Sequence, residues 1–132
     1  MTPIVYLNNL IEELKVSYPE FVKIKTSVGF SPTLMTLNNM NDLPLILIED
    51  IEYNNDASLV IMNGGKLTFN LLYLDHITED NGYNILESNF LIKFNNFLLN
   101  LKNDITINNI KYNTDEENRY ALTYNLSTFI EF

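Results

Sequence analysis

The sequence contains few residues suited to catalysis, and the best placed of them is a histidine that follows an aspartate. His76 is the single histidine of the chain and comes directly after Asp75. Histidine changes its charge near neutral pH, so this pair has the chemistry for proton transfer or for half of a metal site. No nucleophile motif accompanies it, and the chain contains no cysteine. A histidine of this kind is more often an ordinary surface residue, and we expect that role for His76.

A cluster of carboxylates is the second candidate for chemistry. Glu49, Asp50 and Glu52 follow a run of apolar residues, at the end of an expected strand. Two such carboxylates have the ligand chemistry for Mg²⁺ or for a general acid and base pair. No second acidic motif completes a nuclease or transferase site. The cluster is therefore better interpreted as the solvated end of a strand.

Two further patterns resemble binding motifs only in part. The sequence Gly-Gly-Lys at 64–66 lacks the spacing of a phosphate-binding loop and the serine or threonine that follows it, so it is interpreted as a turn. Tyr112, Tyr120 and Tyr124 have the rings for a base-stacking platform, but packing between neighbouring strands explains them better. We assign no catalytic, cofactor-binding or metal-binding residue and expect that the protein is not an enzyme.

Length and charge narrow the class of protein. The 132 residues fit a single domain, residues 1–132, and 46% hydrophobic residues are enough for a packed core. The net charge is −9, with one arginine and seven lysines, so a protein that grips nucleic-acid phosphates is not expected. The N-terminus has no basic run, and no apolar stretch approaches the ~20 residues that span a bilayer. We expect neither a signal peptide nor a membrane span.

Asparagine is strongly over-represented, with 21 residues, whereas alanine occurs only twice. The codons for asparagine and isoleucine are AT-rich, so an AT-rich genome explains this composition. Many phages and some low-GC bacteria have such genomes.

The elements that would position these residues begin with a helix. Thr2 is a suitable N-cap and Pro3 suits the first helical position. Apolar residues then recur at helical spacing as far as Tyr18, and Pro19 ends the helix. Residues 22–28 alternate between apolar and polar side chains, which predicts a half-exposed strand.

The rest of the chain predicts mainly strands. The apolar run that begins at residue 43 predicts a strand at 43–53. We expect it to be the central strand of the sheet and to be buried on both faces. Residues 59–62 and 67–74 flank Asn-Gly-Gly at 63–65, which predicts a hairpin. A broad apolar stripe predicts a second helix at about 83–102, buried over more than one face, so that it lies between layers or meets another subunit. Strands follow at 105–112, bulged at 108–109, and at 120–132.

This order predicts an α+β fold with a mostly antiparallel β-sheet and two helices packed on it, in the order α-β-β-β-β-α-β-β. Residues 29–42 have no clean period but contain several apolar residues. Such a loop either forms a contact arm or folds over its own core, and both remain open. Together with the widened stripe of the second helix, it supplies the proposed interface residues, which are Phe30, Leu34, Met35, Leu37, Met40, Leu91, Ile92 and Leu99.

The element order resembles that of the tail terminator and tail-completion proteins of tailed bacteriophages. The resemblance rests on an Asp-Leu-Pro entry into an apolar strand at 42–48, a hairpin strand that ends near an acidic residue at 67–75, and a helix at about 83–102 that spans the sheet. It covers nearly the whole chain but contains no diagnostic motif. The long apolar segment at 29–42 and the asparagine-rich composition depart from the family.

The resemblance implies a structural subunit of a head–tail connector or tail ring in the virion neck, made in the host cytoplasm. It implies self-association into rings of six or twelve copies, contact with other neck and tail proteins, and passage of DNA without specific binding. No cofactor is implied. In a ring, one surface of each subunit binds a different surface of the next subunit, so the chain needs two different surfaces that can bind each other. The alternative is a small acidic phage inhibitor or DNA mimic that acts on a host protein.

Overall fold

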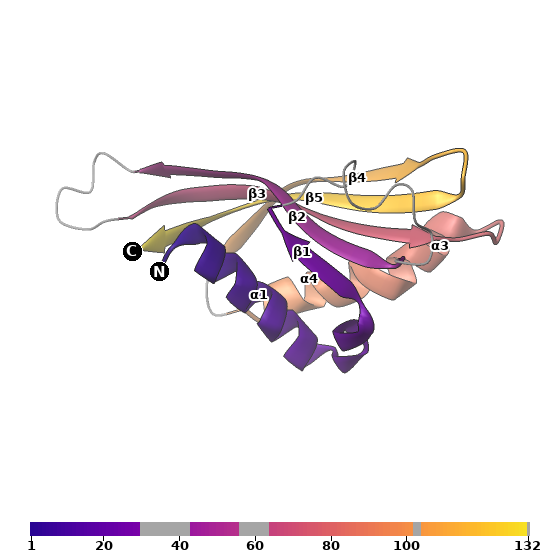
Figure 1. Ribbon diagram of the computed structural model, residues 1–132, viewed down its shortest axis with the longest axis horizontal. Helices are drawn as coiled ribbons and strands as arrows, with labels where there is room; N and C mark the ends of the chain where they lie inside the picture. Colours follow the sequence, from indigo (N-terminus) through magenta and orange to yellow (C-terminus); the bar gives the residue numbers. More distant parts are fainter. Residues whose placement is uncertain (30–42, 56–63, 102–103, 132) are drawn as a thin grey trace.

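The computed structural model describes residues 1–29, 43–55, 64–101 and 104–131 (Figure 1). These residues form a five-stranded sheet with two long helical segments, which both lie on the same side of the sheet (Figure 1). The predicted α+β class, with a mostly antiparallel sheet and two helices, is confirmed. None of the described helices has the length and apolar character needed to cross a membrane.

Helix α1 (Pro3–Ser17) begins and ends where its sequence signals indicate. The hydroxyl of the N-cap residue Thr2 accepts a hydrogen bond from the backbone N–H of Val5 at 3.3 Å. Such a bond satisfies one of the backbone donors that a helix N-terminus leaves without a partner. The buried side of α1 consists of Tyr6, Leu7, Leu10, Ile11 and Leu14.

The sheet has the strand order β1-β2-β3-β5-β4. Its strands are β1 (Lys25–Val28), β2 (Leu45–Asn55), β3 (Gly64–His76), β4 (Ile105–Thr114) and β5 (Arg119–Glu131). β1 pairs with β2 in parallel, and the other pairs are antiparallel. The middle strand is β3, so the prediction that residues 43–53 form the central strand is wrong. Burial on both faces depends on what packs against each face of the sheet and does not require the middle position, and β2 lies between β1 and β3.

The start of the sheet also differs from the prediction. Residues Pro19–Lys23 form a 3₁₀ helix, η1, and the strand β1 begins only at Lys25. Phe21 points into the core whereas its neighbour Val22 is exposed. Proline at the first position of η1 favours a helical turn, since its φ is already close to the helical value. The alternation from residue 22 onward was therefore a weaker signal than the proline before it.

The predicted turn at 63–65 is wrong for its two glycines, which open strand β3. Gly65 pairs with Asn55 of β2, and Gly64 pairs with Glu131 of β5. A Cβ at Gly65 would lie 2.1 Å from the backbone carbonyl oxygen of Asn54. Glycine is needed there because two backbones approach closely, a role that looks the same in sequence as a turn. The predicted strand at 59–62 lies outside the described residues.

The second helical segment runs from residue 82 to residue 99 in three parts. These are α3 (Gly82–Leu86), a π-helical turn η3 (Glu87–Leu91) and α4 (Ile92–Leu99). Its buried side chains include Leu86, Phe90, Phe94, Phe97 and Leu98. Ile92 and Leu99 are exposed, so the predicted position between two layers of the same chain is wrong, whereas contact with another subunit stays a prediction.

The main core lies between the helices and the sheet, and an aromatic cluster fills its centre. The ring of Phe90 stacks on those of Tyr73 and Phe94, with centroids 4.6 and 4.9 Å apart. Phe90 also contacts Phe21 and stands edge-on to Tyr124. This cluster joins η1, the second helical segment and the two strands β3 and β5, so it holds the second helical segment and η1 on the sheet.

A smaller apolar cluster lies on the opposite face of the sheet. Successive side chains of a strand point to opposite faces, so Ile46 and Ile48 join the main core whereas Leu45 and Leu47 do not. Leu45 and Leu47 are nevertheless buried, together with Leu74. The prediction of burial on both faces is confirmed for Leu45–Ile48, whereas the rest of β2 is half-buried or exposed.

Candidate functional site

The candidate acid–base pair at the end of β3 is separated by the strand geometry. His76 is exposed and lies opposite Arg119 in the sheet register. The carboxylate of Asp75 accepts hydrogen bonds from the backbone N–H of His76 at 2.8 Å and from the Tyr73 hydroxyl at 3.3 Å. The side chain of Asn89, in the π-helical turn, is a further partner. Asp75 therefore ties the π-helical turn to the sheet.

Burial raises the pKa of the Asp75 carboxyl, against the hydrogen bonds from His76, Tyr73 and Asn89 and the charge of His76. When the folded pKa lies above the unfolded one, the folded chain binds the proton more tightly. The favourable contribution of Asp75 to stability is then present at acidic pH and is lost as the pH rises through the folded pKa.

Replacing Asp75 by asparagine removes this titration. We expect the unfolding free energy of the Asp75→Asn chain to increase relative to that of the parent as the pH rises from acidic to neutral. The reason is that only the parent develops a negative charge at this partly buried position. Urea denaturation at a series of pH values measures the difference. The substitution Asp80→Asn, at an exposed carboxylate in a turn, controls for net charge. A difference between Asp75→Asn and the parent that does not change with pH would contradict this role.

The acidic cluster of β2 does not form a metal site. Asp50 has a positive φ of 52°, and the register of β2 against β3 shifts between Glu49 and Glu52. The carboxylates then have separate partners: Asp50 accepts from the Asn70 amide at 2.9 Å, and Glu52 accepts from the Asn54 amide at 3.0 Å. Burial, and then repulsion by Asp50, raise the pKa of Glu49. In the part of the chain that the structure describes, no three His, Cys, Asp or Glu side chains gather as metal ligands.

An amide ladder crosses the sheet on the face opposite the helices, and sequence reasoning missed it. Asn70 of β3 donates to Asp50 of β2, Asn125 of β5 donates to Asn70 at 2.8 Å, and Asn108 of β4 donates to Asn125 at 2.9 Å. The ladder gives four strands a continuous polar connection. Its signal in the sequence is an asparagine among the outward-facing residues of β3, β4 and β5 and an aspartate in β2, but only the register reveals that they meet.

The three tyrosines considered as a stacking platform have different surroundings. Tyr124 is buried, and its hydroxyl donates to Asn95 at 2.8 Å. Tyr112 and Tyr120 each stand edge-on to Tyr83, with ring centroids 5.6 and 5.3 Å apart. The Tyr112 hydroxyl donates to Glu87 at 2.7 Å. These contacts fasten α3 to β4 and β5, and they leave no set of parallel ring faces.

The proposed interface residues fall into two groups. Leu91, Ile92 and Leu99 lie on the second helical segment, where Leu91 is half-buried against the core. Ile92 and Leu99 are 56% and 82% exposed. They are about two helical turns apart, so they share one side of α4. The other five, which lie outside the described residues, are Phe30, Leu34, Met35, Leu37 and Met40.

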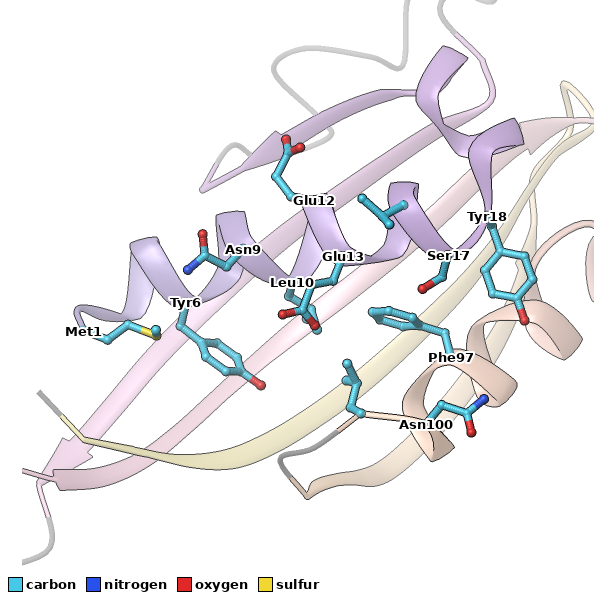
Figure 2. A pocket seen from close by; sticks show the side chains of 12 residues that line it. Met1, Tyr6, Asn9, Leu10, Glu12, Glu13, Ser17, Tyr18, Phe97 and Asn100 are labelled. Atoms are coloured by element: carbon cyan, nitrogen blue, oxygen red, sulfur yellow. The ribbon is translucent and has the colours of Figure 1, made fainter.

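A groove of about 910 Å³ lies between α1 and the C-terminal end of α4 (Figure 2). Leu10 and Tyr6 border it on one side and Phe97 on the other, with Glu13 and Asn9 among its polar residues. The hydroxyl of Tyr6 forms a hydrogen bond with the side chain of Thr128. Burial, and to a lesser extent the nearby charge of Glu13, raise the pKa of Tyr6. No sequence signal indicated this groove, because it depends on the spacing of two helices.

The described residues thus offer surfaces for contact and no assembled catalytic set. Two of the described cationic side chains form ion pairs within the chain. Lys93 pairs with Glu20 at 3.0 Å, and Arg119 pairs with Asp115 and Glu117. Comparison of the chain with known protein families and with curated proteins found no match in either.

Proposed function

We propose that this protein is a structural subunit of a bacteriophage neck or tail connector ring, similar to a tail terminator, which joins head and tail and lets DNA pass. The observation that carries the proposal is the unlike pair of edges of the sheet. β1 is a short edge strand parallel to its neighbour, and β4 is a long edge strand antiparallel to its neighbour. No strand among the described residues pairs with the outer side of either.

Unlike edges favour head-to-tail association. An edge strand offers backbone N–H and C=O groups along which a further strand can pair. When two different surfaces of one subunit bind each other in successive copies, the assembly closes into a ring if the rotation allows it. The β4 edge also exposes Ile107 and Tyr112, and Ile92 and Leu99 add apolar surface on α4. These surfaces support self-association through heterologous contacts.

Charge and chemistry support the passive role toward DNA. The net charge of −9 repels phosphate groups, so DNA would pass through such a ring without binding to it. The acidic side chains of the described residues are spread over both helical segments, η1, the strands β2, β3 and β5 and the connections before α3, before β4 and between β4 and β5. A DNA mimic needs its carboxylates gathered on one face, and this scatter therefore favours the ring subunit.

The test is a double substitution on α4. We expect Ile92→Asp with Leu99→Asp to abolish self-association, because two carboxylates would be buried without partners in the contact. Both side chains are exposed in the single chain, so the fold should persist by circular dichroism. Sedimentation velocity measures the assembly state.

A matched pair of substitutions controls for added charge. Ile4→Asp with Val22→Asp also replaces two exposed apolar residues, on α1 and η1. This control chain should assemble like the parent. Assembly that persists in the Ile92 and Leu99 variant would remove α4 from the contact, and a parent chain that is monomeric at all concentrations would contradict the ring.

A further inference from the structure

The groove between α1 and α4 has an apolar floor and an acidic border. Leu10 and Phe97 are each 4% exposed and form its floor together with Tyr6. Figure 2 shows Glu13 beside Leu10 on the same side of α1, with Phe97 across the groove. The lining contains two carboxylates, Glu12 and Glu13, and no lysine or arginine of the described residues.

This combination defines the chemistry of a ligand. Apolar side chains gain by leaving water when they pack on leucine and phenylalanine. Glu12 and Glu13 are exposed carboxylates, and they favour a cationic side chain in a segment that packs on this floor, because opposite charges attract. An occupant that satisfies both has an apolar side chain beside a lysine or an arginine.

A second copy of this chain is a poor source of that occupant. Each copy carries a net charge of −9, so two copies repel each other unless a contact buries apolar surface between them. Three of its described cations are engaged locally, since Lys15 donates to Thr26, Lys93 pairs with Glu20 and Arg119 pairs with Asp115. A partner with more basic residues meets the groove without this repulsion.

We propose that the groove binds a short segment of a different protein, which places an aliphatic side chain on Leu10 and Phe97 and a lysine or arginine at Glu13. The proposal does not depend on ring formation, because it uses neither the edges of the sheet nor the exposed residues of α4. The groove would give the protein a second, separate contact surface.

The experiment uses the full chain and a fluorescein-labelled amphipathic peptide of leucine and lysine, followed by fluorescence polarisation at moderate salt. A peptide with glutamate in place of lysine should bind at least about tenfold more weakly. Glu12→Lys with Glu13→Lys should weaken binding of the lysine peptide by about tenfold. Glu79→Lys with Asp80→Lys changes the net charge equally at exposed sites away from the groove and should weaken it less than about twofold.

A neutral variant separates the groove from general attraction. Ser17, at the exposed end of α1, lines the groove, and Ser17→Trp would fill it without a change of charge. We expect this variant to lose about tenfold in affinity as well. Absence of peptide binding, equal effects of the two charge reversals, or full binding by Ser17→Trp would each overturn the proposal. Loss of self-association in Ser17→Trp would assign the groove to a second copy and would also overturn it.

Discussion

Replacing Phe90 by alanine is expected to lower the free energy of unfolding by about 3–5 kcal/mol, the usual cost of removing a fully buried aromatic side chain. Phe90 lies on the π-helical turn, and its ring contacts Tyr73, Phe94 and Tyr124. The substitution would leave a cavity that these rings cannot close, because Tyr73 and Tyr124 are fixed in the two central strands. Equilibrium denaturation in urea measures the loss.

An exposed phenylalanine provides the control. Phe129 of β5 is 46% exposed and belongs to no buried cluster among the described residues. Phe129→Ala should change the unfolding free energy by no more than about 0.5 kcal/mol. If Phe90→Ala cost no more than this control, the aromatic cluster would not be the centre of the core.

Gly65→Ala is expected to have the next largest effect, a loss of about 3 kcal/mol at the upper end of the range for overpacking. An added Cβ would lie 2.1 Å from the carbonyl oxygen of Asn54 on the neighbouring strand. The carbonyl group of Asn54 belongs to the backbone and cannot rotate away as a side chain does. The strands β2 and β3 must therefore separate locally. Thermal unfolding of the purified variant measures the effect.

The neighbouring glycine allows a matched comparison. A Cβ at Gly64 would also be crowded, but by the far end of the Phe129 ring, at 2.7 Å. That ring is half-exposed and can turn aside, so Gly64→Ala should cost clearly less than Gly65→Ala. An equal or larger loss for Gly64→Ala would mean that the close approach of β2 and β3 is not what requires glycine at position 65.

The fold could be predicted where local chemistry determines it. Thr2, Pro3 and Pro19 mark the ends of α1 by capping and by backbone restriction, which need no other part of the chain. The last strand and the bulge near Asn108 were likewise visible, and both are confirmed, since β5 spans Arg119–Glu131 and the register of β4 shifts between Ile107 and Asn109. The two glycines of β3 were misassigned, because glycine serves a turn and a close backbone approach equally well.

The candidate surfaces were harder to predict, because they arise from tertiary structure. The amide ladder needs the register of β3, β5 and β4 to bring Asn70, Asn125 and Asn108 together. The groove needs the separation of α1 from α4. In contrast, the prediction that His76 is an ordinary surface residue needed only the local sequence, and His76 is exposed in the structure.

Native mass spectrometry of the tagged chain, isolated from the cells that produce it, tests the proposed function most directly. A connector subunit should appear as a closed ring of six or twelve copies, or together with portal, tube or other virion proteins. A one-to-one complex with a host nuclease or DNA-binding protein would contradict the ring and would support an acidic inhibitor instead.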